Sequence, residues 1–387
     1  MRGLLSFLRR EWLFCLLLAL LPLLTALAPG PTSDTIRHLP ELLHTETLLM
    51  LAGLLVLTRG IEASGYLAAA GAWLVARVPT QRALALLLVA FSAVLSMAVT
   101  NDVALFIVVP LTLALRDLAP LRLGRLVIFE ALAVNAGSAL SPIGNPQNLF
   151  LWQRSGAEFT TFLTAMAPLV VPLLLVLLLI TAAVFPGQRV AIRPAASAAP
   201  TRPRLLAAAL GLYPLFIPLA DRGFGVIALL AILLLFILCW RDVLRGVDWL
   251  LLGVFALMFL DLGLLAGLPG WAEPAAQASA SPLGAFFAGI ALSQAVSNVP
   301  AAIFLATATE PWPAACAAAH GTCVWVPLAW GVTVGGFGLA LGSLANLIAL
   351  RLAGLPHLWV AFHGWSLAAL AVATAIGWLM LDAVAPG

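Results

Sequence analysis

Long uncharged stretches run through this sequence and leave few ways for it to fold. They include residues 12–33, 131–153, 159–188, 223–240, 311–350 and 352–381. A helix of about 20 apolar residues crosses the roughly 30 Å of hydrocarbon in a bilayer. Because lipid offers no partner to backbone N–H and C=O groups, only helices and closed barrels can span it. Residues 170–180 lack the alternation of polar and apolar side chains that a barrel strand needs. We therefore predict an all-α polytopic membrane protein.

The composition excludes several other classes of protein. Hydrophobic residues make up 63% of the chain and charged residues only 9%, whereas soluble domains carry about 25% charged residues. A soluble enzyme and a disordered scaffold are therefore excluded. Nucleic-acid binding needs a basic face in water, and the arginines of this chain are instead grouped in short segments between apolar stretches.

The arginine groups also predict the orientation, because cytoplasmic loops carry an excess of basic residues. The N-terminus imitates a secretory signal, but Pro29 would follow the cleavage site and Glu11 interrupts the basic region. A retained first helix is therefore expected. We predict a multi-pass protein of the bacterial inner (cytoplasmic) membrane with a cytoplasmic N-terminus and an external C-terminus.

Two apolar stretches fit neither one crossing nor two. Residues 83–115 are interrupted by polar residues at 100–102, and residues 274–309 are interrupted at 297–300. We predict two re-entrant helical hairpins, 82–115 entering from the inside and 281–309 from the outside, each with a polar tip. Irregular backbone at that depth survives only when it is buried in protein or lines a cavity. Two long tilted helices with incidental polar residues remain the alternative.

The two stretches belong to an internal repeat. Residues 100–102 correspond to 297–299, an offset of 197, and residues 137–149 correspond to 335–347, an offset of 198. We predict a first repeat over 1–185 with a broken helix at 126–152, and a cytoplasmic linker over 186–204. A second repeat over 205–387, inverted relative to the first, contains a broken helix at 321–351. Inverted repeats with broken helices are typical of secondary transporters.

The polar break at 141–148 has the chemistry of an ion site. Pro142 and Pro146 remove backbone donors and Gly144 relaxes the backbone. Freed carbonyls can coordinate a cation, and helix N-termini can face an anion. Close helix packing is the alternative explanation for the glycines of the second copy. The predicted substrate- and ion-binding residues are Thr100, Asn101, Asp102, Ser141, Gly144, Asn145, Gln147, Asn148, Ser297, Asn298, Gly342, Ser343 and Asn346.

These motifs resemble those of the ion transporter superfamily, which groups arsenite efflux pumps, sodium/proton antiporters and divalent anion–sodium symporters. Residues 100–105 followed by Pro110, and residues 297–300, are most similar to the arsenite-pump branch. Residues 141–149 are similar to the break of both the arsenite and the dicarboxylate branches. The resemblance implies an elevator-type transporter, in which a domain with both hairpins moves against a scaffold, and a homodimer. It also implies a Na⁺ site at Asn101, Asp102, Asn145 and Asn148.

Asp102 is the predicted coupling group, because an ionisable residue inside the membrane is a functional candidate by default. A helix N-cap is the competing interpretation of this aspartate. A dianion about 4 Å from its carboxylate would be repelled by about 4 kcal/mol at an effective dielectric of 20. Di- and tricarboxylate substrates are therefore disfavoured unless Asp102 is protonated or paired with a cation.

We expect structural roles for the other ionisable residues in or near the apolar stretches. Glu130 is expected at a membrane boundary, and Arg59 is expected to pair with Glu62 near a break in residues 45–77. His357 and His363, with His320, are expected at helix ends. Cysteines 15, 239, 316 and 323 show no metal or disulfide spacing.

The sequence therefore predicts a secondary active ion transporter, not an enzyme. Proton- or Na⁺-coupled movement of a small inorganic anion or oxyanion such as arsenite is favoured. Sodium/proton antiport is the first alternative and sodium-coupled transport of an organic anion is the second. An ion channel or an intramembrane enzyme would be a different class, and the residues lack the nucleophile–base or metal spacing of an enzyme. Expected partners are the transported ion, the lipid bilayer and a second copy of the chain. No cofactor is expected beyond H⁺ or Na⁺ as coupling ion.

Overall fold

The computed structural model describes residues 11–29, 31–66, 69, 78, 80–115, 122–189, 201–309, 325–355 and 357–384. Every element of regular secondary structure within these ranges is a helix. The one other feature there is an isolated antiparallel β-bridge between Thr80 and Arg189. The prediction of an all-α protein is therefore confirmed. Five described helices are long and apolar enough to cross a membrane, and a bent pair, α3 (Thr32–Leu42) and α4 (Thr45–Ala63), makes a sixth.

The N-terminal third contains one helix that the sequence did not indicate. After α2 (Trp12–Leu27), helix α3 occupies a segment for which no element was predicted, and it is bent by 47° from α4. Helix α4 continues through Arg59 and Glu62 and ends at Ala63, so the chain breaks directly after Glu62, where Gly65 adopts a positive φ of 78°. The expected pairing is confirmed, because Arg59 Nη1 lies 2.8 Å from Glu62 Oε2.

Two helix pairs occupy the predicted hairpins. The first pair is α6 (Gln81–Ala98) and α7 (Asn101–Ala114), and the second is α16 (Pro282–Val296) and α17 (Asn298–Ala308). Thr80 and Ser281 cap α6 and α16, each accepting a hydrogen bond from the backbone N–H three residues later. We call residues 99–102 the first tip and residues 297–299 the second tip. Of the four helices in these two pairs, α6 is the one that is long and apolar enough to cross a membrane.

Two broken helices accompany these pairs. Helices α8 (Leu123–Ser138) and α9 (Pro146–Ser155) flank residues 139–145, the first break. Helices α18 (Trp325–Gly335) and α19 (Leu344–Ala353) flank residues 336–343, the second break, which contains a 3₁₀ turn, η3 (Ala340–Gly342). Residues 321–324 of the predicted second broken helix lie outside the described residues. The first helix of each hairpin packs closely on the helix that precedes the break of the same half: α6 packs on α8 and α16 packs on α18.

Glycines make these helix contacts possible. A Cβ added at Gly137 would lie 2.2 Å from the Ala93 carbonyl oxygen, and one at Gly335 would lie 2.5 Å from Ser293 Cβ. Close packing therefore explains the glycine at both corresponding positions.

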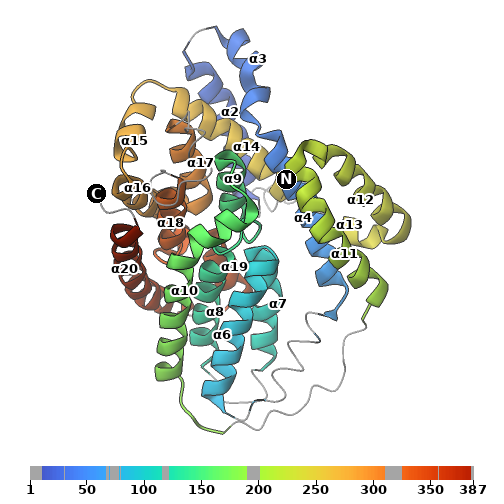
Figure 1. Cartoon of the computed structure of the whole chain (residues 1–387), viewed down its shortest axis with the longest axis vertical. Helices are drawn as coiled ribbons and strands as arrows, with labels where there is room; N and C mark the ends of the chain where they lie inside the picture. The colour runs from blue at the N-terminus through green and yellow to red at the C-terminus, as the bar shows by residue number, and fades with distance from the viewer. Residues whose placement is uncertain are drawn as a thin grey trace, which may run out of the picture.

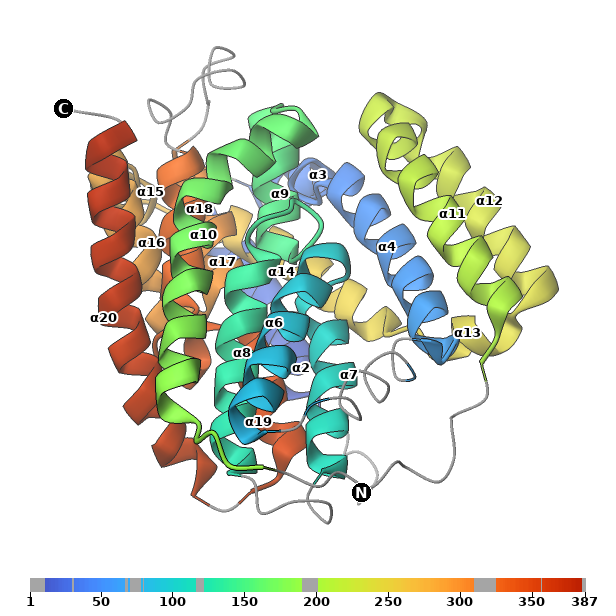
Figure 2. The same cartoon turned by 60° about the horizontal axis from the view of Figure 1, so that its bottom comes forward.

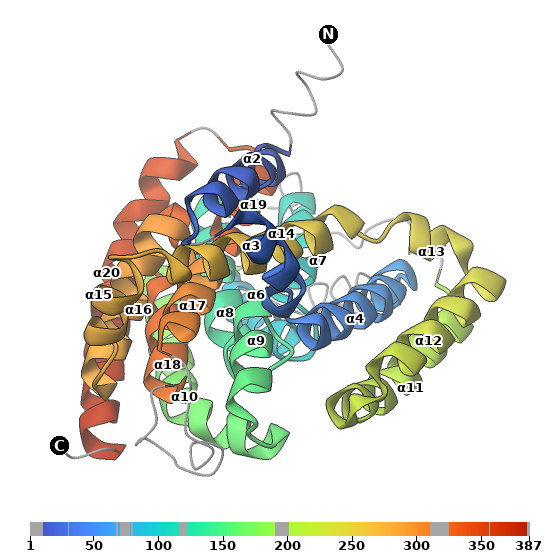
Figure 3. The ribbon, with the colours of Figure 1, turned by 90° about the horizontal axis from the view of Figure 1, so that it is seen from above.

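The remaining helices surround this core. They are α10 (Phe159–Val184), α11 (Pro203–Leu219), the π-helical turn η1 (Ala220–Phe224), α12 (Gly225–Cys239), α13 (Arg241–Arg245), α14 (Trp249–Gly267), α15 (Ala272–Ala278) and α20 (Leu358–Val384). Helices α4, α11, α12 and α13 gather on one side and α20 lies at the opposite edge (Figures 1, 2 and 3). Residues 190–200 of the predicted linker lie outside the described residues.

Large apolar side chains face outward on the peripheral helices. Leu179 is 70% exposed, Ile227 68% and Val360 73%. In water such a surface would drive association. These helices are consistent with a protein surrounded by lipid.

Candidate functional site

The first tip is hydrogen-bonded directly to the first break. The backbone N–H of Asn101 donates to the Gly144 carbonyl at 2.9 Å. The Ser141 hydroxyl donates to the Met97 carbonyl at 2.7 Å, and Thr100 and Asn101 are both buried. These contacts bring the predicted residues of the first half into one cluster.

The first break closes on itself through its asparagines. Asn145 caps α9, accepting from the Asn148 backbone N–H at 2.8 Å. The Asn148 amide donates to the carbonyls of Ala139 and Ser141 at 2.9 and 3.3 Å. These bonds satisfy carbonyls that the interrupted helix leaves free.

Two buried amide oxygens in this cluster have no hydrogen-bond partner within the described part of the chain. They are Gln147 Oε1 and Asn148 Oδ1. Neutral oxygens suit a hard cation, so the chemistry of Asn148 fits its place in the predicted Na⁺ set. No group of three His, Cys, Asp or Glu side chains that could hold a metal occurs among the described residues.

Asn135 on α8 supports the second break. Its amide donates to Asn346 Oδ1 at 2.8 Å and to the Gly336 carbonyl at 3.1 Å, and it accepts from the Ser343 hydroxyl at 3.0 Å. Asn346 also donates to Gly336 at 2.9 Å. A residue of the first half therefore completes the polar cluster of the second half.

The second tip meets the second break through a glutamine. Gln294 donates to the Gly335 carbonyl and accepts from the Leu339 N–H, both at 2.8 Å. The predicted residues Ser297 and Asn298 are buried at this tip, and the Ser297 backbone adopts a positive φ of 78°. Gly342 donates its N–H to Leu339 at 2.8 Å.

Asp102 faces a central cavity of about 500 Å³. Thr100, not Asp102, is the N-cap of α7, and Asp102 lies in the first helical turn. The N-cap interpretation is therefore wrong, although a carboxylate in the first turn is still favoured by the helix dipole. The cavity lies between α7 and α19 on one side and α2, α4 and α14 on the other. Lining residues include Phe14, Arg59, Glu62, Asp102, Val103, Asp248, Leu251, Leu347 and Arg351.

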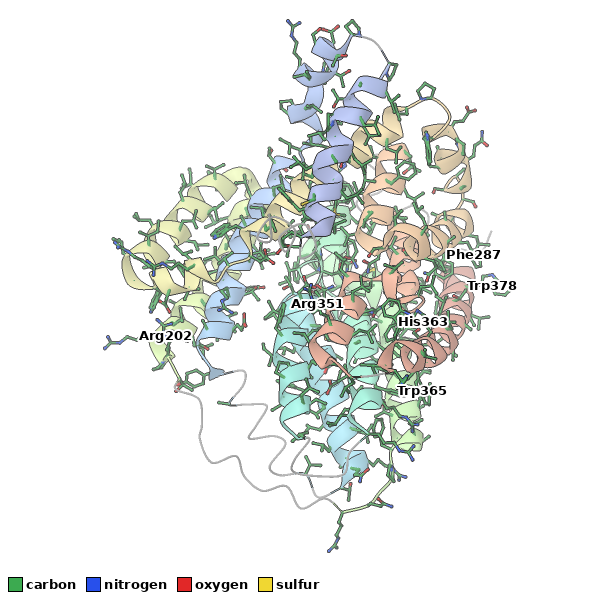
Figure 4. All side chains as sticks on the ribbon, turned by 180° about the vertical axis from the view of Figure 1, so that it is seen from behind. Arg202, Phe287, Arg351, His363, Trp365 and Trp378 are labelled. Atoms are coloured by element: carbon green, nitrogen blue, oxygen red, sulfur yellow. The ribbon has the colours of Figure 1, made fainter. Side chains whose placement is uncertain are left out.

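Arginine and carboxylate side chains share this cavity. Arg59 is paired with Glu62. Arg351, near the end of α19, forms no ion pair with a described residue, and it lies centrally in Figure 4. Asp248 lines the cavity from the start of α14. The cavity can thus hold both a cation, near Asp102, and an anion, near Arg351.

Four residues of the site were not among those predicted: Asn135, Gln294, Asp248 and Arg351. Asn135 could have been found, because it lies 198 residues before Thr333 in the same repeat register that relates the breaks. Gln294 lies one turn before the second tip. Nothing in the sequence places Arg351 in the same cavity as Asp102, because the packing of α19 on α7 brings the two helices together.

Other expected placements are corrected. Glu130 is fully buried and accepts a hydrogen bond from Thr112, so it is not at a boundary. His363 accepts from the Ala340 N–H at 3.2 Å and therefore touches the second break. Both carboxylate oxygens of Asp261 are buried without a partner within the described ranges. Cys316, His320 and Cys323 lie outside those ranges.

Comparison with known proteins identifies the family. Residues 4–335 match the family described as "Citrate transporter" (CitMHS). The Escherichia coli K12 "Inner membrane protein YbiR" is 42% identical over 343 residues, covering 88% of this chain and 89% of that protein. The "Uncharacterized transporter MJ0456" of Methanocaldococcus jannaschii is 32% identical over 263 residues, 67% of each chain. The "Uncharacterized transporter Mb2703" of Mycobacterium bovis is 25% identical over 345 residues, 80% of this chain and 79% of that protein.

The family match agrees with the resemblance to the ion transporter superfamily seen in the tips and breaks. The chain therefore belongs to the CitMHS citrate transporter family and is a membrane-embedded secondary transporter, not an enzyme.

Proposed function

We propose that this transporter couples the movement of a proton or Na⁺ to that of a small inorganic anion or oxyanion, such as arsenite. The observation that carries the proposal is the shared lining of one cavity by Asp102 and Arg351. Asp102 is the coupling group, loaded with a cation on one side of the membrane and emptied on the other.

The charges of the cavity support coupled binding. An anion alone would be repelled by the Asp102 carboxylate. A proton or Na⁺ on Asp102 removes that repulsion, and Arg351 then supplies the positive charge that an anion needs. The coupling ion and the anion thus favour each other's binding, which is a thermodynamic basis for symport.

An inverted repeat and an elevator-type cycle complete the proposal. Corresponding helices pack in corresponding ways: α7 contacts α19, and α17 contacts α9. This exchange of partners supports two copies related by an approximate two-fold axis. The part with α6–α10 and α16–α20 would move against a scaffold that contains α4 and α11–α14, in a homodimer with a cytoplasmic N-terminus and an external C-terminus.

Two alternatives each have an observation in their favour. Sodium/proton antiport is favoured by the additional carboxylates of Glu62 and Asp248 along the cavity. Sodium-coupled transport of an organic anion is favoured by the family's description as citrate transporters and by the guanidinium of Arg351 in the lining of the cavity. The substrate separates the three functions.

Flux measurements test the proposal. The purified protein is placed in vesicles with a pH gradient or a Na⁺ gradient, applied separately, after a panel of oxyanions and carboxylates has been tested for thermal stabilisation at two pH values. We expect one gradient to drive uptake of a small oxyanion, and Arg351→Gln to raise its KM about tenfold. Cation exchange with no anion requirement would establish antiport instead, and carboxylate uptake would establish the organic-anion function.

The contribution of the second tip is tested with Asn298→Ala, with Leu179→Ala on the exposed face of α10 as the control. We expect flux to fall at least tenfold in the first variant only. Equal flux in both variants would remove the second tip from the site.

A further inference from the structure

A second cavity, of about 440 Å³, lies where helices α8 and α20 begin. Both helix starts lie at the same end of the molecule (Figure 2). The polar lining consists of Arg122, Arg125 and His357, with the indole of Trp365 beside them. The rest of the lining is apolar: Leu123, Ile128, Leu355, Leu358 and Ala361.

The Arg125 guanidinium is held in a defined place. Its Cζ lies 5.4 Å from the centre of the Trp365 ring, within the distance of a cation–π contact. Phe129 packs edge-on against the same indole at 5.2 Å between ring centres, which fixes the indole (Trp365 is labelled in Figure 4). Stacking on the ring leaves the N–H edge of the guanidinium available to an anion.

The arrangement of charge is unfavourable without an anion. Arg122 is the N-cap residue of α8, Arg125 lies in its first turn, and both line the cavity. They lie at the start of α8, where the helix dipole disfavours cations. No carboxylate lines this cavity among the described residues, and neither arginine forms an ion pair with any of them.

The surroundings indicate an anion that comes from the bilayer. The outward face at the start of α20 is apolar, with Trp359 51% exposed and Val360 73% exposed. Tryptophan is enriched where a membrane protein passes from hydrocarbon to headgroups. Basic pockets between transmembrane helices at this depth suit anionic headgroups.

We infer that this cavity binds the phosphate of an anionic phospholipid between Arg122 and Arg125. The acyl chains then lie along Trp359 and Val360. This site is separate from the central cavity and does not depend on the proposed substrate.

Binding is tested with the full chain in phosphatidylcholine nanodiscs with or without 20 mol% phosphatidylglycerol, by thermal midpoint and by lipid retention in native mass spectrometry. The wild type is compared with Arg122→Gln/Arg125→Gln and with a matched control, Arg241→Gln/Arg245→Gln on α13. We expect retention of phosphatidylglycerol by the wild type and the control. Each arginine removed from the cavity should weaken binding about fivefold.

Three outcomes would overturn the inference. The first is equal retention by the cavity double variant. The second is equal loss in the control, which would show only a general attraction of basic residues to an anionic surface. The third is full stabilisation by inorganic phosphate in pure phosphatidylcholine, which would make the ligand a free anion. If the double variant does not fold, Arg122→Gln alone, at an exposed position, gives the same comparison with a smaller expected loss.

Discussion

In the first half of the chain the tip is tied to its break mainly through backbone groups, whereas in the second half side chains make the same junction. The Met97 carbonyl and the Asn101 N–H hold the first tip in place. In the second half the Gln294 side chain makes the corresponding hydrogen bonds. Asn135 on α8, a residue of the first half, accepts a hydrogen bond from Ser343 of the second break.

The two halves therefore place a tip beside a break in similar ways, but different side chains and charges hold the tip and the break together. The first tip carries a negative charge at Asp102, while the second carries Val299 at the corresponding position. The first break contains Pro142, is followed directly by Pro146 at the start of α9, and bonds to itself. The second has none and depends on a residue from the other half. We therefore expect the coupling ion to bind in the first half, and we expect the second half to depend on contacts from the first half for its stability.

Substitution of Asp102 in the first tip should have the largest effect on transport. Asp102→Asn keeps the volume of the side chain and removes its charge, so we expect gradient-driven flux to fall at least a hundredfold. Loss of the favourable dipole interaction should cost only about 0.3–1 kcal/mol of stability. Flux in vesicles and the thermal midpoint measure both quantities. Val299→Thr is the control and should change flux less than threefold. Undiminished coupled flux in Asp102→Asn would refute the coupling role.

Removal of the support between the halves should come second. Asn135→Ala leaves Asn346 Oδ1 and the Ser343 hydroxyl without their partner in a buried cluster, whereas the Gly336 carbonyl keeps the Asn346 amide. We expect a loss of about 3 kcal/mol. Thr333→Val, at the corresponding position of α18, should be nearly neutral, because the Thr333 hydroxyl has no partner among the described residues. Denaturant unfolding in mild detergent compares the two variants. Equal destabilisation would show that the second break does not depend on α8.

The tip junctions predict a smaller difference. Gln294→Leu leaves the Leu339 N–H without its partner and the Gly335 carbonyl with the Gly338 N–H as its remaining donor, which should cost about 2 kcal/mol. Met97→Leu should cost less than about 1 kcal/mol, since Met97 contributes its backbone carbonyl to the first junction and keeps it. The same unfolding measurement applies. A larger loss in Met97→Leu would reverse the assignment of backbone and side-chain junctions.

A surface pair outside both junctions should have the smallest effect. Arg202 donates to Asp242 at 2.5 and 3.2 Å, linking the start of α11 to α13. The hydrogen bond from Arg202 lowers the pKa of Asp242 below its usual value. Its stabilising effect is therefore complete above the ordinary pKa of about 4 and is lost as pH falls through the lowered value. Because the pair is exposed, Asp242→Asn should cost under about 1 kcal/mol at pH 7. The difference between wild type and variant should shrink as the pH falls below about 4, and a difference that does not change with pH would exclude the ion pair as its cause.

Much of the arrangement of helices could be predicted from the sequence, because lipid forces helices on apolar stretches and an internal repeat shows itself as a constant offset. The bounds of α6, α7, α16 and α17 follow closely from the polar interruptions. Helix α3 was missed because its residues are polar. Glu130 was misplaced because it lies near the start of the predicted broken helix of 126–152, while its burial depends on α7 packing over it.

The sequence by itself determined that this protein lies in a membrane, that its halves correspond, and which segments interrupt their helices, because hydropathy and spacing are local properties of a chain. Only the tertiary structure decided that Arg351 shares a cavity with Asp102 and that Asn135 serves the other half. Both arrangements involve residues more than two hundred positions apart, and helix packing, not the order of the sequence, brings them together.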